Sequence, residues 1–247
     1  MVASEQERWG QVSDQSEPSW YLDPLVAGQK RREHQNLIRR WVTDAPGTLL
    51  KTDLFEEAYG ADHILFDLFP QARSVIGIDI AWSTVRRAKR NCSLAQAGFF
   101  VADVRRLALS DGSVDLIISN STLDHFHTAA EFRQALQELT RVLRPGGQII
   151  VTMDNPFNPL YWPLRWLSRL PNAPFPLGYI TSLKGLLRSL TECGLAVTAA
   201  EPLIYNPRLV STALFLALRK TLGTQADAPI RFLLRVFALR GSCRAAK

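Results

Sequence analysis

The sequence LTRVLRPGGQIIVT occupies residues 139–152 and predicts the end of a helix, a tight turn and the start of a buried strand. Its first apolar residues recur at helical spacing and so share one helix face: Leu139, Val142 and Leu143. Pro145 cannot continue a helix, and the two glycines after it allow a sharp reversal of the chain. The apolar run at 148–153 then fits a strand that is covered on both faces. We therefore predict a helix that packs on a sheet and leads directly into one of its strands.

Outward from this stretch, strand and helix patterns alternate along the chain. The expected strands are 48–52, 74–80, 99–102, 113–119, 148–153 and 195–203, and the expected helices are 28–44, 62–69, 83–97, 130–143 and 182–193. This alternation predicts an α/β fold, a doubly wound and mostly parallel sheet with helices on both faces. Such sheets bind ligands at the carboxyl ends of their strands, beside the point where the strand order reverses.

The same patterns divide the chain into three parts. Residues 1–46 form a polar leader and a helix, and residues 47–204 form the α/β domain. Within that domain, residues 155–180 are dense in proline and aromatic side chains and predict a lid-like insertion. Residues 205–247 predict a basic tail with two helical segments, 208–221 and 229–240.

Charge and composition exclude several classes of protein. The chain has 247 residues with a net charge of +6, yet residues 203–247 hold eight Lys and Arg against one Asp, so the remainder carries −1. Residues 1–202 contain no basic stripe, and this argues against nucleic-acid binding. The three cysteines form no CxxC pair, and His125 and His127 lack an evident third ligand, so we expect no metal site. No apolar run suits a signal peptide or a membrane span, and we expect a cytoplasmic protein.

The string RVLRPGG at 141–147 resembles the class I S-adenosylmethionine-dependent methyltransferases. In that family the helix before the fifth strand commonly ends in this pattern and leads into a strand of this kind. The resemblance covers roughly residues 47–204. It implies a Rossmann-like methyltransferase fold, S-adenosyl-L-methionine as the cofactor and a small molecule as the methyl acceptor.

Two acids at strand ends match the cofactor-binding positions of this family. Asp79, with Ile80 after it, corresponds to the acid that accepts hydrogen bonds from both ribose hydroxyls. Asp103, with Val104 after it, corresponds to the acid that takes the adenine amino group, while the next backbone amide meets a ring nitrogen. Without the family resemblance, the sequence is also compatible with Asp79 as the cap of the following helix and with Asp103 as a surface turn residue.

The sequence SNSTLDHF at 119–126 lies where the family places the loop over the reactive sulfonium. Asn120 is therefore expected to contact the cofactor. His125 is a candidate general base because its ordinary pKa lies near neutrality. Its alternative roles are a wall of the methionine pocket or plain packing.

The first loop departs from the family pattern, which reads hydrophobic strand, acid and then G-x-G-x-G. Residues 48–60 read TLLKTDLFEEAYG, with Gly60 as their only glycine. If Lys51 takes the acidic position, the methionine ammonium meets a like charge. We therefore expect a replacement carboxylate from Asp53, Glu56 or Glu57, in what the sequence suggests is an acidic turn. The alternative is a degraded loop that binds no cofactor.

Two functions from different classes follow from these observations. The first is methyl transfer, in line, to a small apolar or ring-bearing molecule beneath the aromatic insertion. The second is a methyltransferase-fold pseudoenzyme that acts as a binding or membrane-associated partner. A nicotinamide dehydrogenase would need a G-x-G-x-x-G string, which the chain lacks. The basic amphipathic segment 229–240 would either lie on an anionic membrane surface or pack on the sheet; the sequence leaves the oligomeric state open.

Overall fold

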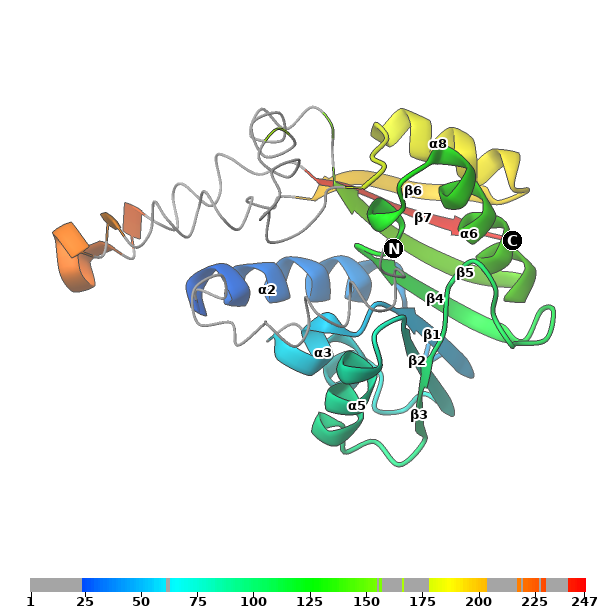
Figure 1. Cartoon of the computed structure of the whole chain (residues 1–247), viewed down its shortest axis with the longest axis horizontal. Helices are drawn as coiled ribbons and strands as arrows, with labels where there is room; N and C mark the ends of the chain where they lie inside the picture. Colours follow the sequence, from blue (N-terminus) through cyan, green and yellow to red (C-terminus); the bar gives the residue numbers. More distant parts are fainter. Residues whose placement is uncertain are drawn as a thin grey trace, which may run out of the picture.

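The computed structural model describes residues 24–60, 63–154, 156, 166, 178–203, 217–218, 220–226, 228–229 and 240–247 (Figure 1). Its strands are β1 (Thr48–Thr52), β2 (Ser74–Asp79), β3 (Ala97–Val101), β4 (Val114–Asn120), β5 (Leu143–Asp154), β6 (Ala196–Leu203) and β7 (Arg240–Ala246). Its helices are α2 (Pro24–Trp41), α3 (Phe55–Tyr59), α4 (Ile64–Leu68), α5 (Trp82–Asn91), α6 (Ala129–Val142) and α8 (Leu183–Glu192), with short 3-10 turns η1 (Leu123–His125) and η2 (Gly223–Ala226).

The strands form one seven-stranded sheet in the order β3-β2-β1-β4-β5-β7-β6. Strands β1 to β5 pair in parallel, and β7 pairs antiparallel with both β5 and β6. The order reverses between β1 and β4, which is the switch point of a doubly wound sheet. The predicted fold class is therefore confirmed.

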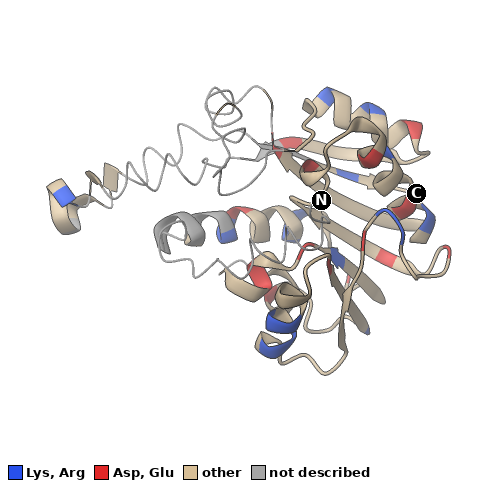
Figure 2. Ribbon diagram, in the orientation of Figure 1, with Lys and Arg blue, Asp and Glu red and all other residues tan. Residues whose placement is uncertain are grey.

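Helices cover both faces of the sheet because neighbouring residues of each buried strand point to opposite sides. Leu50, Ile117 and Val151 belong to one core cluster, together with apolar residues of α6 and α8. Leu49 and Ile118 belong to the other cluster, which includes residues of α2, α4 and α5. Figure 1 shows the two groups of helices on opposite sides of the sheet. The arginines and lysine of α5 are exposed, as its amphipathic pattern predicts, and Figure 2 marks the basic residues of this helix in blue.

The prediction that residues 205–247 form a helical tail outside the domain is wrong for their last part. Residues 240–246 form β7, which fills the sheet between β5 and β6. The sequence RGSCRAA has few strand-forming residues, so its position between two partners outweighs its local propensity. Cys243 and Ala245 are fully buried there.

Several predicted segments lie outside the described residues. These are residues 1–23 of the leader, nearly all of the lid-like insertion and most of the segment 229–240. The proposed lid and the proposed membrane contact therefore stay predictions. None of the helices in the described ranges is long and apolar enough to cross a membrane.

Two turns predicted from the sequence take another form. The acidic stretch 53–57 is not a turn throughout, because the short helix α3 begins at Phe55 and contains both glutamates, which are buried. The turn at 145–147 is an irregularity within β5, where the pairing with β4 skips from Leu143 to Gln148. Gly146 adopts a left-handed backbone there, with φ of 74°. Its amide donates to the carbonyl of Lys247, which ties this irregularity to the chain after β7.

Candidate functional site

The carboxyl ends of the parallel strands carry most of the side chains that the sequence predicts for the site. Asp53 follows β1, Asp79 closes β2 and Asn120 closes β4. Asp103 lies two residues beyond the end of β3. Because β2, β1 and β4 are neighbours in the sheet, Asp79, Asp53 and Asn120 share one edge at the switch point.

Asp79 links the second strand to the loop after the first. Its Oδ2 accepts a hydrogen bond from the backbone amide of Leu54 at 2.9 Å, and its Oδ1 accepts one from Ala81 at 2.8 Å. Burial and the nearby Asp53 carboxylate raise the pKa of Asp79 to about 7, although these amides and Lys51 oppose the shift. Ala81, rather than Asp79, is the N-cap of α5. Each carboxylate oxygen keeps further acceptor capacity beyond its one amide.

The shifted pKa of Asp79 also affects stability. The folded protein holds a proton on Asp79 that the unfolded chain has released between about pH 4 and 7. This stabilising contribution is complete below the unfolded pKa and is lost as the pH rises through 7. The edge of the sheet therefore carries a carboxyl group whose ionised form is destabilised until a cationic or hydrogen-bond-donating partner approaches it.

Lys51 does not present an uncompensated charge to the site. Its side chain is only 2% exposed, and Nζ lies 2.9 Å from Oε2 of the fully buried Glu57. Nζ also donates to the carbonyl of Asp53. Of the three candidate carboxylates in the first loop, Glu57 is thus committed to an internal ion pair. Glu56 is 7% exposed, so Asp53 is the most accessible of the three.

Gly60 lies at the end of α3 rather than in the turn after β1. A side chain at this position would collide with Glu56, since an added Cβ would lie 1.9 Å from its Oε2. A larger residue here would therefore require the Glu56 side chain to move. Contact between Gly60 and the cofactor stays a prediction.

Two non-glycine residues adopt left-handed backbones at the strand ends that flank the switch point. Asp53 has φ of 65° and Ser121 has φ of 57°. Between them, the hydroxyl of Thr52 is hydrogen-bonded to Ser119 at 3.1 Å and also to Thr122. Such conformations cost free energy and concentrate at functional sites. The ends of β1 and β4 are therefore cross-linked by side chains and locally strained.

Asp103 is engaged by an arginine from the same loop. Arg105 donates to both carboxylate oxygens of Asp103, with Nε at 3.0 and 2.9 Å and Nη2 at 2.6 Å. The same guanidinium contacts Glu131, near the start of α6, at 2.9 Å and lies over the ring of Phe126. Val104 is buried beside this pair. Arg105 thus ties the loop after β3 to the start of α6.

The loop after β4 folds into η1 and brings His125 toward the same edge. His125 is partly exposed, while its neighbour Asp124 is buried and accepts a hydrogen bond from the amide of Asp154 at 3.0 Å. Asn120 Oδ1 accepts from the hydroxyl of Thr152. The described residues contain no group of three or more His, Cys, Asp or Glu that could hold a metal ion.

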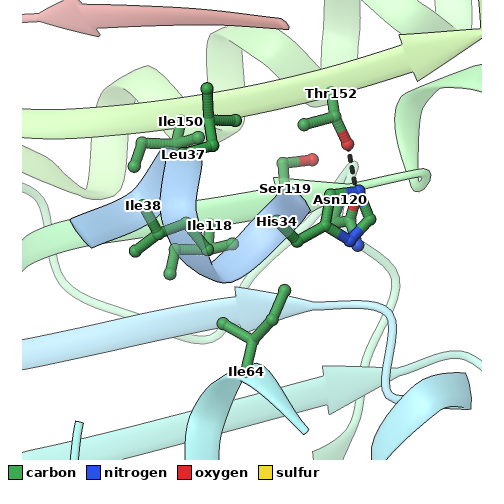
Figure 3. A pocket seen from close by; sticks show the side chains of 9 residues that line it. All are labelled: His34, Leu37, Ile38, Ile64, Ile118, Ser119, Asn120, Ile150 and Thr152. Atoms are coloured by element: carbon green, nitrogen blue, oxygen red, sulfur yellow. Dashed lines mark hydrogen bonds between the residues drawn. The ribbon is translucent and has the colours of Figure 1, made fainter. Parts of the chain in front are cut away.

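A small pocket lies between α2 and the carboxyl ends of β4 and β5 (Figure 3). Its walls are Leu37, Ile38, Ile64, Ile118 and Ile150, and its polar end consists of His34, Ser119, Asn120 and Thr152. The sequence analysis missed His34, which is 1% exposed. A signal was present, because His34 shares the helical spacing of the apolar residues Leu37, Ile38 and Trp41 and therefore belongs to the buried face of α2.

The sequence of the chain is similar to those of known methyltransferases. Residues 56–151 match the family described as a methyltransferase domain. The chain is similar to trans-aconitate 2-methyltransferase of an Azoarcus species, with 31% identity over 63% of this chain and 61% of that protein. It is 25% identical to phthiotriol/phenolphthiotriol dimycocerosates methyltransferase 1 of Mycobacterium ulcerans over 65% of this chain and 57% of that protein. The chain thus spans less than two thirds of the length of these relatives.

A solved structure shares the fold over nearly the whole chain. The N-methyltransferase NodS of Bradyrhizobium japonicum, in complex with S-adenosyl-L-homocysteine, has a TM-score of 0.64 and 15% identity, and the match covers 98% of this chain and 97% of NodS. These similarities do not favour the alternative of a pseudoenzyme. The family match begins at residue 56, so it leaves out β1 and residues 53–55, the start of the loop that departs from the G-x-G-x-G pattern.

Proposed function

The chain belongs to the class I S-adenosylmethionine-dependent methyltransferase family, and we propose that it transfers a methyl group from S-adenosyl-L-methionine to a small molecule. One observation carries this proposal. Asp53, Asp79 and Asn120 lie together at the carboxyl ends of β1, β2 and β4, where this fold binds its ligand.

The residues present at this edge fit the chemical groups of the cofactor. Asp79 would accept from the two ribose hydroxyls, and Asp53 would face the methionine ammonium in place of the usual acid. Ile80 and Val104 would supply apolar contacts to the adenine ring. Because Asp103 is already bonded to Arg105, it would offer the adenine amino group only its remaining acceptor capacity.

Methyl transfer requires little of the protein beyond alignment of the acceptor with the methyl group. When bound, S-adenosyl-L-methionine supplies a methyl group that is already electrophilic. The protein then has to hold an acceptor in line behind that group and keep water out. Asn120, which is hydrogen-bonded to Thr152 at the ends of β4 and β5, would contact the cofactor beside this position. His125 remains a candidate for receiving its proton.

The pocket below α2 does not identify the acceptor. Its walls are mainly isoleucine and leucine, with polar groups at one end, and it has room for about one water molecule. The proposal of an apolar or ring-bearing acceptor therefore rests on the aromatic residues of the insertion 155–180. The relatives act on acceptors as different as trans-aconitate and a phthiotriol dimycocerosate, so their names do not narrow the choice.

The proposed activity is tested with cofactor that carries an isotopic label in its methyl group. The purified protein is incubated with the labelled cofactor and pooled small-molecule extracts, and the small molecules are then separated from protein and analysed for label. We expect label in a small molecule in the presence of the protein, and much less label with the Asp79→Ala variant at cofactor concentrations below its weakened affinity. Absence of label together with absence of cofactor binding would contradict the proposal.

His34 offers a prediction about the buried face of α2. Replacing it with leucine keeps an apolar side chain of similar size in the wall of the pocket and should leave cofactor affinity within about twofold, since His34 lies on α2 and not on the strand ends that carry Asp53 and Asp79. The matched control is Gln35→Leu on the same helix, which breaks a hydrogen bond to Asp67 but does not line the pocket. Calorimetry measures the affinity of both variants. A loss of tenfold or more in His34→Leu alone would place His34 in the cofactor site.

Cofactor binding should depend on pH through Asp79. With a pKa of about 7 in the free protein, Asp79 is mostly protonated at pH 6 and ionised at pH 8. Hydroxyl donors and a cationic ligand favour the ionised form, so affinity should rise by up to about tenfold per pH unit below 7 and level off above 8. Calorimetric titrations between pH 5.5 and 8.5 measure this. The Asp79→Asn variant should lose the dependence, and a flat profile in the unaltered protein would contradict the assignment.

A further inference from the structure

The loop after β1 keeps its shape without the glycines that the family uses there. Asp53 has φ of 65°, a conformation that costs free energy for any residue with a side chain. Its own carboxylate contributes, since Oδ1 accepts from the amide of Phe55 at 2.8 Å. The peptide between Asp53 and Leu54 also has hydrogen-bond partners outside this turn.

Both ends of this peptide are held by charged side chains. Its carbonyl, from Asp53, accepts a hydrogen bond from Nζ of Lys51. Its amide, from Leu54, donates to Oδ2 of Asp79 at 2.9 Å. A buried cation therefore holds one end and the candidate ribose acid holds the other. If Asp53 left the left-handed region, this peptide would rotate and both bonds would break.

The cation is held in place by a buried partner. Nζ of Lys51 lies 2.9 Å from Oε2 of Glu57, whose Oε1 accepts from the amide of Leu65. Asn91 on α5 donates to the backbone carbonyls of Glu57 and Ala58. Glu57 is thus held against α4 and α5 by hydrogen bonds, and its ion pair with Lys51 keeps the Lys51 ammonium beside the first loop.

We infer that the buried Lys51–Glu57 ion pair takes the place of the family's glycine loop by holding the Asp53–Leu54 peptide in position for cofactor binding. This inference rests on the proposed function, because it assigns the pair a role toward the cofactor. Lys51 and Glu57 are positioning residues that act through Asp53 and Asp79. Their role differs from stability alone, since a buried ion pair can often be replaced by apolar residues of similar size without loss of stability.

The test uses the full chain with both charges removed together, as Lys51→Met/Glu57→Leu, so that no lone charge is buried. We expect this variant to melt cooperatively and to bind S-adenosyl-L-methionine at least tenfold more weakly than the unaltered protein, as measured by calorimetry. The control removes an ion pair distant from the loop, as Arg40→Gln/Glu201→Gln, and should bind normally. Normal affinity in the Lys51→Met/Glu57→Leu variant would overturn the inference.

A second measurement keeps the test decisive if that variant fails to fold. In the unaltered protein, the amide proton of Leu54 should be protected from exchange and its chemical shift should follow the titration of Asp79. An unprotected Leu54 amide with no such response would overturn the inference. Failure of the unaltered protein to bind the cofactor would count against the proposed function itself, whereas the inference fails only if the unaltered protein binds and either of these two results is negative.

Discussion

Replacing Asp79 with alanine is expected to weaken binding of S-adenosyl-L-methionine by roughly 30- to 150-fold. Two charge-assisted hydrogen bonds to ribose hydroxyls would be lost, which corresponds to about 2–3 kcal/mol. The amides of Leu54 and Ala81 would also lose their acceptor, so the loop after β1 would loosen at the same time. Calorimetry gives the affinity, and a melting curve shows that the variant is folded.

Asp115→Ala provides the matched control. Asp115 is also an acid in a strand, and its carboxylate accepts a hydrogen bond from the backbone amide of Thr48 at 2.6 Å. It lies near the start of β4, and therefore at the amino-terminal ends of the parallel strands, away from the site. Both variants lose a comparable backbone contact, and only Asp79→Ala should lose cofactor affinity. Unchanged affinity in a folded Asp79→Ala variant would remove Asp79 from the site.

Deleting residues 240–247 is expected to abolish cooperative folding. β7 lies between β5 and β6 and is paired with both along its whole length. Its loss would expose the edges of two strands and open the core around Cys243 and Ala245. In addition, Nζ of Lys247 donates to the carbonyls of Thr140 and Leu143 at the end of α6, each at 2.8 Å.

The truncated chain is compared with a chain that lacks Lys247 alone, which keeps β7 and loses only the bonds that this residue makes. Circular dichroism in the near ultraviolet and thermal melting report tertiary packing. The shorter truncation should melt cooperatively at a slightly lower temperature. A cooperative transition in the chain that ends at residue 239 would show that β7 is dispensable.

The parallel part of the sheet could be predicted from the sequence because its buried strands are continuous apolar runs. Residues 74–80 and 113–119 carry this signal strongly, and the strands that they form, β2 and β4, end in the polar residues Asp79 and Asn120. Once the parallel order is known, the placement of Asp79 and Asn120 at one edge follows from chain direction alone. Local pattern and overall fold agree at these positions.

The remaining features depend on contacts between distant residues, which local patterns do not reveal. The sequence RGSCRAA of β7 becomes a strand because β5 and β6 flank it. The sequence at 53–57 suggests an acidic turn, yet residues 55–59 form a helix in which Glu57 is paired with Lys51 in the interior. His34 was missed for a similar reason, since its partners in the pocket come from β4 and β5, more than 80 residues later in the chain.

The departure of the first loop from the family pattern therefore has a physical explanation. The lysine at the expected acidic position is neutralised by Glu57, so the methionine ammonium would not face an unpaired like charge. Asp53 is left as an accessible carboxylate beside Asp79, whose raised pKa reflects that proximity in part. A loop without glycines is thus compatible with a cofactor site in this chain.

The central claim is that the strand ends around Asp53 and Asp79 bind S-adenosyl-L-methionine. Isothermal titration of the full chain at pH 8, where Asp79 is ionised, tests it most directly. The account predicts saturable binding of one cofactor per chain with a dissociation constant in the micromolar range, about −8 kcal/mol, and competition by S-adenosyl-L-homocysteine. Absence of measurable binding at about millimolar cofactor, close to −4 kcal/mol, by a protein that melts cooperatively would contradict it.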